Sequence, residues 1–327
     1  MAERRTAIIG IGAYLPSKVL TNWDLEKMVD TSDEWIRTRT GIRERRIAPE
    51  GIYTSTMSVE ASRQALQMAG LRPEQIDLIL CCTVTPDYPF PATAALIQKD
   101  LGAWNAFGFD MQAACAGFLY GLTVADQFIR TGAARYVLVV GVELLSRVTD
   151  WQDRSTCVLF GDAAGAAVLT AAEDRGLLAS RMYLDGSLWD LIYLPAGGTR
   201  MPASEKTVQE RLHFLRMRGN EVFRVAVRYM GRAVREVLED AGLTPDQVDW
   251  LVPHQANHRI TQALIDYLGL PPERVYANIE YTGNTSAASI PVALAEMLEK
   301  GLLRSGQVVG LTALGAGIAY GAALLRW

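Results

Sequence analysis

The sequence is poor in the residues that build metal clusters and disulfide frameworks. Only four cysteines and three histidines occur in 327 residues, and no two cysteines stand in a CxxC pair. Four cysteines at this length exclude a scaffold held together by disulfides, and the absence of CxxC spacing argues against a structural zinc site. We therefore expect no metal site and a reducing compartment, which is the cytoplasm.

Long apolar runs and a strong charge of one sign are missing as well. No apolar run reaches the roughly 18 residues needed to cross a bilayer, so we expect no membrane span. The stretch after Met1–Thr6 is broken by Gly10 and Gly12, and we expect no cleavable export signal. A formal net charge of −4 argues against a nucleic-acid partner. A hydrophobic fraction of 50% indicates a folded chain, long enough for two domains or one large core.

What the sequence does contain is an internal repeat. Residues 61–83 and 233–255 align without gaps at an offset of 172 and share nine of 23 residues, among them an Ala-Gly-Leu-x-Pro-x-Gln-x-Asp pattern. A second pair, 161–169 and 317–325, shares six of nine residues. An offset near half the chain length indicates a duplicated domain, because solenoid repeats recur every 20–50 residues or so.

Each copy of the first repeat predicts a helix, a turn and a buried strand. The helix should end at Gly70 or Gly242, because glycine adopts the left-handed conformation that terminates helices. Apolar runs of strand length follow, and further helices and strands alternate along the chain, which favours an α/β architecture with covered sheets. We expect two duplicated halves, residues 1–172 and 173–327. The irregular segment 173–218 breaks the symmetry, and such segments often shape a substrate entrance.

Cys115 stands at a predicted junction between a strand, 107–111, and a helix, 117–130. The positive end of a helix dipole favours a thiolate, and the small neighbours in Ala113-Ala114-Cys115-Ala116-Gly117 leave room for an acyl group. The alternative is a packing residue, because most free cysteines are small buried hydrophobes. The three other cysteines, each inside an apolar run, fit that second description: Cys81, Cys82 and Cys157.

His254 follows a predicted buried strand in the sequence Val252-Pro253-His254-Gln255-Ala256-Asn257. The carboxyl ends of strands are where α/β folds bind ligands, so a functional histidine is expected there. A structural histidine that is merely hydrogen-bonded stays an equal alternative.

Two polar or glycine-rich loops complete the set of candidates. Asn284 lies in a Gly/Ser/Thr loop before a helix, where asparagine is more often a turn former or N-cap. The run Leu314–Gly317 can offer backbone N–H groups to an oxyanion, or can simply permit close packing. Gly10-x-Gly12 is not a dinucleotide fingerprint, because Leu15 replaces the third glycine.

Taken together, these segments resemble the β-ketoacyl-acyl carrier protein synthase III family of the thiolase superfamily. The resemblance rests on Cys115 in AACAGF, His254 in PHQAN, Asn284 in GNTSAAS and the terminal GAG turn, and it extends over essentially the whole chain through DEWIRTRTGIRERR, FGDAAGAAVL and MRGNEVFRVAV. It implies the five-layered αβαβα thiolase fold, which the internal duplication also fits.

The resemblance implies an acyltransferase that initiates fatty-acid synthesis in two half-reactions. Cys115 takes an acyl group from acyl-CoA, and the backbone N–H groups of Cys115 and Ala316 stabilise the oxyanion. Malonyl-acyl carrier protein then loses carbon dioxide while His254 and Asn284 donate hydrogen bonds to its thioester carbonyl. The carbanion attacks acyl-Cys115 to give 3-oxoacyl-acyl carrier protein. His254 has to be neutral with its proton on Nε2, and no cofactor is required, because coenzyme A arrives as part of the substrate.

The resemblance also implies a coenzyme A site. Trp35, Arg39 and Thr40 match residues at the adenine end, although the five arginines of 37–46, taken alone, favour a solvated basic loop. Thr31 and Glu34 predict a capping box at the start of that helix. The remaining matches are an adenine-side arginine, residues along the pantetheine tunnel, and a residue that reaches across a homodimer interface: Arg154; Gly219, Asn257 and Phe223; and Phe90.

Three departures from the family pattern bear on substrates and partners. Ala316 replaces the usual middle glycine of a GGG turn, which is tolerable only at negative φ. Ser155 replaces a common glycine and is expected to alter the adenine contacts. Arg259 is kept in the helix after His254, but Asp266 and Tyr267 replace residues that are often basic, so docking of the acidic carrier protein is expected to depend on Arg259 and on other arginines. Those other arginines are Arg216, Arg218 and Arg224.

Two other functions stay open at this point. One is a related enzyme of specialised metabolism that transfers an acyl group or supplies a starter unit. The other is a non-catalytic subunit of a condensing heterodimer, against which the complete Cys-His-Asn set argues. The primer, whether acetyl-CoA or another short or branched acyl-CoA, cannot be read from the sequence, because a methylene changes discrimination by only about 1–3 kcal/mol.

Overall fold

The computed structural model describes residues 5–327 and contains two mixed β-sheets with the same strand order. The first sheet runs β1–β7–β6–β4–β5 and the second runs β8–β13–β12–β11. In the first sheet β5, β4 and β6 pair in parallel, while β7 and β1 are added antiparallel. In the second sheet β11 and β12 pair in parallel, while β13 and β8 are added antiparallel. A parallel bridge from Leu251 to Val275 takes the place in the second sheet that β5 takes in the first. The duplication read from the sequence is therefore present in the topology.

The strands of the first sheet are β1 (Arg5–Tyr14), β4 (Leu78–Cys82), β5 (Phe107–Met111), β6 (Val137–Leu144) and β7 (Asp162–Ala172). Those of the second are β8 (Gly176–Leu184), β11 (Trp250–Pro253), β12 (Val308–Gly315) and β13 (Ala319–Arg326). Two small ribbons consist of β2 (Lys18–Thr21) with β3 (Glu44–Ile47) and β9 (Ile192–Tyr193) with β10 (Arg216–Met217). The chain passes from one sheet to the other between β7 and β8. The division into domains at 172/173 stays a prediction.

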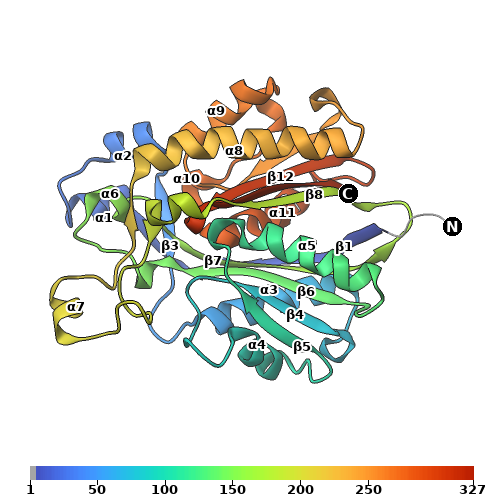
Figure 1. Ribbon diagram of the computed structural model, residues 1–327, viewed down its shortest axis with the longest axis horizontal. Helices are drawn as coiled ribbons and strands as arrows, with labels where there is room; N and C mark the ends of the chain where they lie inside the picture. Colours follow the sequence, from blue (N-terminus) through green and yellow to red (C-terminus); the bar gives the residue numbers. More distant parts are fainter. Residues whose placement is uncertain (1–4) are drawn as a thin grey trace.

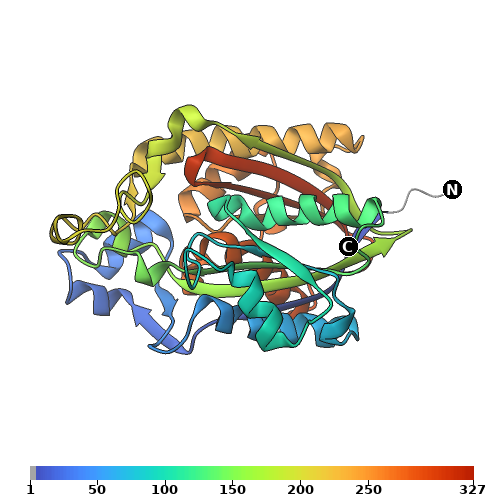
Figure 2. The ribbon, with the colours of Figure 1, turned by 60° about the horizontal axis from the view of Figure 1, so that its bottom comes forward.

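Helices cover both faces of each sheet, so the molecule is layered αβαβα (Figure 1). Helices α5 (Gly117–Arg130) and α11 (Ser289–Glu299) form the middle layer; α3 (Thr54–Ala69) and α4 (Thr93–Leu101) cover the first sheet, and α8 (Gly219–Asp240) and α9 (His258–Leu268) cover the second. Figure 2 shows α5 lying between the two sheets from a second direction. The thiolase-like fold expected from the resemblance is confirmed. The middle helices have their N-termini at the same end of the molecule, and that end carries the site described below.

The residues shared by the two repeats make the same contacts in both halves. Gly70 and Gly242 both have φ of 65° after their helices, as predicted. Gln75 and Gln247 both accept a backbone N–H three residues earlier at 2.9 Å, within the short helices η1 (Pro73–Gln75) and η5 (Pro245–Gln247). The carboxylate of Asp77 accepts the N–H of Tyr136 just before β6, and that of Asp249 accepts the first N–H of β12. These identities thus maintain one local fold in each half.

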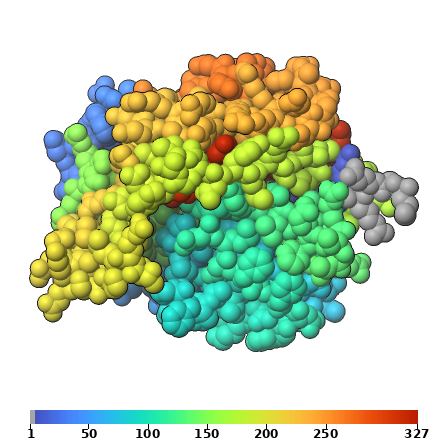
Figure 3. Space-filling view, viewed as in Figure 1, coloured from blue at the N-terminus to red at the C-terminus, as the bar shows by residue number. Residues whose placement is uncertain are grey.

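The remaining helices are short or lie near the end that carries the site: α1 (Asn22–Glu26), α2 (Asp33–Thr40), α6 (Arg154–Cys157), α7 (Glu205–Gln209) and α10 (Ile279–Thr282). The capping box predicted from Thr31 and Glu34 is wrong. Ser32 is the N-cap of α2, because its hydroxyl accepts the N–H of Trp35 at 3.1 Å. The segment around α7 projects from the same end of the molecule as α2 and stands out in the space-filling view (Figures 1–3).

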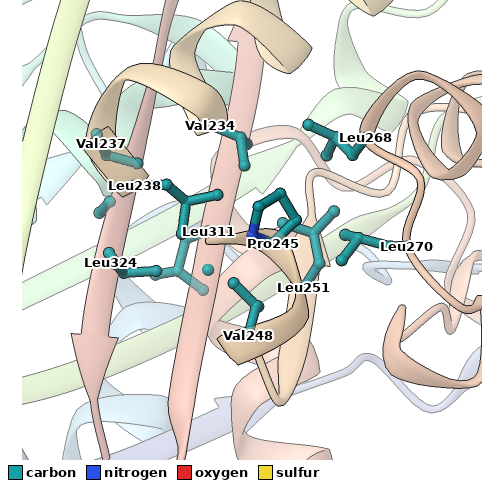
Figure 4. Close-up of a pocket in the computed structure, with 12 residues that line it drawn as sticks. Val234, Val237, Leu238, Pro245, Val248, Leu251, Leu268, Leu270, Leu311 and Leu324 are labelled. Carbon is teal, nitrogen blue, oxygen red and sulfur yellow. The ribbon is translucent and has the colours of Figure 1, made fainter. Parts of the chain in front are cut away.

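A small cavity lies in the core of the second half, between α8, the end of α9 and the second sheet (Figure 4). It holds only about 10 Å³ of free space and is lined almost entirely by aliphatic side chains such as Val234, Leu238, Leu251 and Leu268. A void this small and apolar offers no polar partner even to one water molecule, so it is a packing defect and not a ligand site.

Within residues 5–327, no helix is long and apolar enough to cross a membrane, and no three or more His, Cys, Asp or Glu side chains gather in a geometry suited to a metal ion. All four cysteines are free.

Candidate active site

Residues from both halves line a cavity of about 620 Å³ at the end of the molecule where the middle helices begin. Such a volume is typical of sites for small ligands and cofactors. Of the predicted site residues, eleven line this cavity: Cys115, His254, Asn284, Ala316, Trp35, Arg39, Thr40, Gly219, Phe223, Asn257 and Arg259. Two do not, Arg154 and Phe90. The sequence motifs therefore meet in one place, although they are up to about 280 residues apart in the chain.

Cys115 lies in the short helix η2 (Ala114–Ala116), directly before α5. The strand β5 and this turn deliver it to the start of the helix, as the sequence predicted. Its environment differs from the prediction, because burial raises the pKa of the Cys115 thiol to about 12, and the nearby carboxyl of Glu143 also raises it. The side chain of Ser286 lowers the pKa of the thiol, against the effect of burial. Position at a helix start alone therefore does not explain how a thiolate forms here.

The turn at the end of β12 packs directly against the backbone of Cys115. A Cβ atom added to Gly315 would lie only 2.4 Å from the Cys115 nitrogen, so only glycine permits this approach. The next residue, Ala316, is not among the residues with positive φ; Gly317 at 73° and Ile318 at 51° take the left-handed positions instead. The methyl group of Ala316 is therefore accommodated without backbone strain. The N–H groups of Cys115 and Ala316 belong to two backbone segments that touch.

His254 is 2% exposed and follows β11, as predicted. Its Nδ1 atom lies 2.7 Å from Ser289 Oγ, at the first residue of α11. Burial lowers the pKa of His254 to about 3, so the imidazole is neutral at physiological pH. Ser289 Oγ has no other acceptor for its proton among residues 5–327. We infer that Ser289 donates to Nδ1, which leaves the histidine proton on Nε2.

Asn284 is held so that its amide can serve as a donor. Its backbone bonds Leu159 and Gly161 at 2.9 Å each, which fixes the loop against the end of the first half. Its Oδ1 accepts the N–H of Ser286 at 2.9 Å. The Nδ2 group has no partner among the described residues and belongs to a side chain that lines the cavity. The N-cap or turn alternative is partly correct, because the carbonyl side of the amide does stabilise the turn.

Backbone strain is concentrated at this site. Four non-glycine residues among 5–327 have positive φ, and three of them lie within two residues of the candidate groups: Ala114 at 46°, Ser286 at 48° and Ile318 at 51°. Ala114 and Ser286 occupy equivalent positions of the two repeats, 172 residues apart. Such conformations cost about 1–3 kcal/mol each and are typical of functional sites, where the surrounding packing maintains them.

The basic segment is not a free loop but the helix α2 and the strand β3. Arg39 lies 5.9 Å and Arg154 5.0 Å from the centre of the Trp35 ring, so two guanidinium groups flank one indole. Arg154 also donates to the Asp30 carbonyl at 2.8 Å. The C-terminus of α2 contacts α9, since a Cβ on Gly41 (φ 81°) would lie 2.6 Å from the His258 Cβ. The helix that carries Trp35 is thus connected to the helix that follows His254.

Phe90 does not contribute to the cavity of its own chain. Its side chain is 85% exposed, in the loop between β4 and α4.

Sequence reasoning missed several residues of the site. The largest group is apolar wall residues. Six of them lie outside every quoted motif and are recognisable only in three dimensions: Val84, Leu145, Val158, Ile192, Leu215 and Ile260. Four more lie within quoted segments but were not predicted to line the site: Phe160, Met217, Val222 and Leu314. Ser155, noted as a departure, lines the cavity in place of Arg154. Ser286 and Ser289 belong to the same GNTSAAS motif as Asn284, and Glu143 is a single carboxyl within an apolar strand. The sequence could have indicated these residues, through the position of both serines in that motif and through the isolated acidic residue in the strand.

Comparison with known proteins gives one consistent result. Family models described as 3-oxoacyl-[acyl-carrier-protein] synthase III and its C-terminal part match residues 109–186 and 238–327. A curated relative from Symbiobacterium thermophilum, β-ketoacyl-[acyl-carrier-protein] synthase III, is 55% identical over 100% of this chain and 99% of its own.

Solved structures agree. The crystal structure of 3-oxoacyl-[acyl-carrier-protein] synthase III from Aquifex aeolicus has a TM-score of 0.91 and 51% identity, over 98% of this chain and 100% of that one. The priming β-ketosynthase of the R1128 polyketide pathway also has a TM-score of 0.91, with 40% identity over 99% of this chain and 97% of that one. The chain belongs to the 3-oxoacyl-[acyl-carrier-protein] synthase III family.

Proposed function

We propose that Cys115, His254 and Asn284 divide a decarboxylating condensation into two half-reactions within this cavity. The chain is an acyl-transferring condensing enzyme by family, and the observation that supports these residue roles is that all three line the same cavity as Ala316. In the first half-reaction the Cys115 thiolate attacks the carbonyl carbon of an acyl-CoA. The oxyanion of the tetrahedral intermediate accepts hydrogen bonds from the backbone N–H groups of Cys115 and Ala316. The carbon–sulfur bond to coenzyme A then breaks, and acyl-Cys115 forms.

In the second half-reaction His254 and Asn284 act on the malonyl thioester of an acyl carrier protein. His254 Nε2–H and Asn284 Nδ2–H donate to its carbonyl oxygen, which stabilises the enolate that forms as carbon dioxide leaves. A neutral imidazole suits this role, because an imidazolium would protonate the carbanion. The enolate carbon attacks acyl-Cys115, releases the thiolate and gives 3-oxoacyl-carrier protein. The electrons come from the broken carbon–carbon bond, so the chemistry needs no cofactor.

The basic end of the cavity suits the nucleotide of coenzyme A. Trp35 offers an aromatic surface to adenine, and Arg39 and Arg154 offer positive charge close to that indole. Between this end and Cys115, the wall residues Gly219, Phe223 and Asn257 would line the pantetheine path. Thr40 is buried and bonds Ile36 and Ile42, so we assign it a role in ending α2 correctly.

The surface around the cavity mouth offers free positive charge for an acidic carrier protein. Arg259 stacks on Phe223 at 5.7 Å and Arg224 lines the cavity, and neither has an acidic partner within residues 5–327. Arg216 and Arg218, by contrast, are paired with Asp150 and Asp190. We therefore expect docking to depend on Arg224 and Arg259.

Tyr267, a departure from the family pattern, serves packing instead. Its ring fills the space over Gly231, where a Cβ would lie 2.4 Å from it, and Arg235 lies 4.5 Å above the ring centre. This contact joins α8 to α9.

A homodimer fits the exposed edge of the first sheet. The edge strand β5 has exposed aromatic side chains at Phe107 and Phe109, and the exposed Phe90 lies in the loop that follows the neighbouring strand β4. An unpaired apolar edge of this kind favours pairing with another chain. The partner's strand would cover β5, and Phe90 would reach the acyl end of the partner's cavity. Four free thiols also suit a reducing compartment, and we place the enzyme in the cytoplasm.

A second candidate function is supply of the starter unit in specialised metabolism, which is favoured by the similarity to the R1128 priming β-ketosynthase. Both functions share the chemistry above and differ in the carrier protein.

The test uses the purified chain with a panel of acyl-CoA primers and malonyl-carrier protein. We expect acylation of Cys115, detected by intact mass, and release of carbon dioxide with 3-oxoacyl product. Cys115→Ser should abolish the acyl-enzyme, while His254→Ala should impair decarboxylation far more than acylation. Equal loss of both steps in His254→Ala would contradict the assignment. Comparing a fatty-acid carrier protein with a polyketide carrier protein separates the two candidate functions.

A further inference from the structure

A carboxyl group is buried beneath the candidate site without a positively charged partner. Glu143, in β6, is 0% exposed, and no arginine, lysine or histidine of the described chain pairs with it. It is held entirely by neutral donors: Thr85 Oγ1 at 2.7 Å, the Val84 N–H at 3.2 Å, Ser286 Oγ at 3.2 Å and Thr83 Oγ1 at 3.3 Å. A buried acid of this kind is costly to keep, which points to a function.

Ser286 lies between this carboxyl and the nucleophile. Its hydroxyl donates to Glu143 Oε1 at 3.2 Å. Ser286 and Cys115 line the same cavity, and the Ser286 side chain lowers the pKa of the Cys115 thiol, against the effect of burial. Ser286 lines the cavity and Glu143 does not, so the serine separates the acid from the substrate. The backbone N–H of Ser286 bonds Asn284 Oδ1 at 2.9 Å, which fixes the residue in its positive-φ conformation. Ser286 therefore connects the buried carboxyl of Glu143 with the cavity that Cys115 lines.

The first half-reaction needs an acceptor for the thiol proton, and the histidine is poorly suited to that role. Nδ1 of His254 faces Ser289, and burial lowers the pKa of His254 to about 3, so the imidazole is a weak base. Burial raises the pKa of the Cys115 thiol to about 12, so the thiolate does not form unaided at neutral pH.

We propose that Glu143 is the proton acceptor for Cys115 and that Ser286 relays the proton. The Cys115 S–H proton passes to Ser286 Oγ as the Ser286 O–H proton passes to Glu143, leaving a thiolate, an intact serine and a neutral carboxylic acid. After the thiolate has displaced coenzyme A, the proton returns through Ser286 to the departing thiolate, which leaves as the free thiol. No oxidant or reductant takes part, and Glu143 ends the step ionised again. This inference rests on the proposed acylation of Cys115.

The electrostatic surroundings of Glu143 suit a reversible acceptor. Burial raises its pKa to about 7, while the four donors to the carboxylate act in the opposite direction. The ionisable groups that feel its charge most are thiols, namely Cys81 and Cys82 from β4 and Cys115 from η2. An acid that titrates near neutral pH is efficient in both directions of proton transfer.

The test compares Glu143→Gln and Ser286→Ala with the wild-type enzyme in single-turnover acylation by acetyl-CoA, followed by intact mass between pH 6 and 9. For the wild type we expect a rate that levels off above about pH 7. For both variants we expect about a hundredfold lower rate at pH 7, with a rate that keeps rising about tenfold per pH unit, because hydroxide then has to remove the proton. The double variant should lose no more than either single variant, because both act on one path.

Asp162→Asn is the matched control. Asp162 is also a fully buried carboxyl held by neutral donors, from Ala48 and Ser146, but it has no path to Cys115. This variant should acylate at the wild-type rate with the wild-type pH profile. Ser286→Ala keeps the backbone bond to Asn284, so it provides the test even where Glu143→Gln does not fold.

The outcomes separate the relay from the proposed function. Wild-type rates and profiles in Glu143→Gln or Ser286→Ala overturn the relay, and so does a lower rate with an unchanged pH profile, which indicates a structural role. Acylation of the wild type at a residue other than Cys115 overturns the proposed function and the relay together.

Discussion

The Nδ1 atom of His254 and the hydroxyl of Ser289 form a 2.7 Å hydrogen bond across the interface of the two elements that meet at the site, β11 and α11. The serine donates to Nδ1, so the ring keeps its proton on Nε2, where the proposed enolate needs a donor. Ser289 thus acts through the histidine as a positioning residue, comparable to the second partner of a metal-bound histidine.

Replacing Ser289 by alanine should therefore impair decarboxylation selectively. Without the hydroxyl, either ring nitrogen can carry the proton, and we expect release of carbon dioxide from malonyl-carrier protein to fall about 10–100-fold. Acylation of Cys115 should change less than threefold. Ser62→Ala is the control, because Ser62 is an equally buried helix serine that bonds only the Ser58 carbonyl. A proportional loss of both half-reactions would show that Ser289 only maintains the fold.

The turn at Gly315 and Ala316 gives a prediction with opposite outcomes at adjacent residues. Gly315→Ala places a Cβ about 2.4 Å from the Cys115 nitrogen and should lower the acylation rate at least a hundredfold, because the nucleophile and its N–H donor are displaced. Ala316→Gly should stay within about threefold of wild type, since Ala316 does not need positive φ. Pre-steady-state acylation, followed by intact mass, measures both. A severe defect in Ala316→Gly would contradict the inference that its methyl group is merely tolerated.

The buried neutral histidine predicts a pH dependence of stability. Burial lowers the pKa of folded His254 to about 3 from 6.5, so the unfolded chain takes up a proton that the folded chain refuses. The contribution of neutral His254 to the free energy of unfolding is present in full above about pH 6.5. Up to roughly 4 kcal/mol of it is lost as the pH falls toward 3. Glu143 acts in the opposite direction, because its raised pKa makes the ionised form unfavourable in the folded state as the pH rises through 4.5–7.

The two contributions can be separated by variants. The free energy of unfolding, measured by urea denaturation, should fall more for the wild type than for His254→Gln as the pH is lowered from 7 to 5. As the pH is raised from 5 to 7, Glu143→Gln should become more stable relative to the wild type. Differences that do not depend on pH would show that neither group changes its pKa on folding.

Much of the fold could be predicted because its signals are local. The sequence predicts that helices end at Gly70 and Gly242 and that a buried strand follows each of them. These predictions depend on residues within a few positions of one another, and the same pattern occurs in both repeats. The N-cap of α2 could not be decided this way, because Thr31 and Ser32 are equally good caps and only the path of the chain selects Ser32.

The polar centre of the site could be predicted for a different reason. Cys115, His254 and Asn284 each stand in a distinctive motif, and the resemblance joined them. The apolar wall could not be predicted, because Leu145, Val158 and Leu215 do not differ in sequence from core residues until the two halves are brought together. The prediction that the helix start favours a thiolate was incomplete for the same reason, because burial by distant segments dominates the pKa of Cys115.

The exposed strand β5 predicts how the proposed dimer can be broken. Phe109 is 37% exposed on this edge, and a lysine there should prevent pairing, because charged edge strands resist association. We expect Phe109→Lys to be mainly monomeric in sedimentation equilibrium. Tyr53→Lys, which changes a more exposed aromatic outside β5, should stay dimeric. Loss of acylation in the monomer would support the contribution of Phe90 to the partner's cavity. A dimer that survives Phe109→Lys would place the interface elsewhere.

The indole of Trp35, flanked by Arg39 and Arg154, predicts a defect that depends on the nucleotide part of the donor. Trp35→Ala should raise KM for acetyl-CoA about tenfold, because base–aromatic stacking worth about 1–3 kcal/mol is removed far from the reacting atoms. With acetyl-pantetheine, which lacks adenine, the variant and the wild type should have equal kcat/KM. Trp23→Ala, an exposed indole outside the cavity lining, is the control and should change neither donor. A loss of the same size with both donors would mean that Trp35 maintains α2 and the basic end of the cavity without contacting the nucleotide.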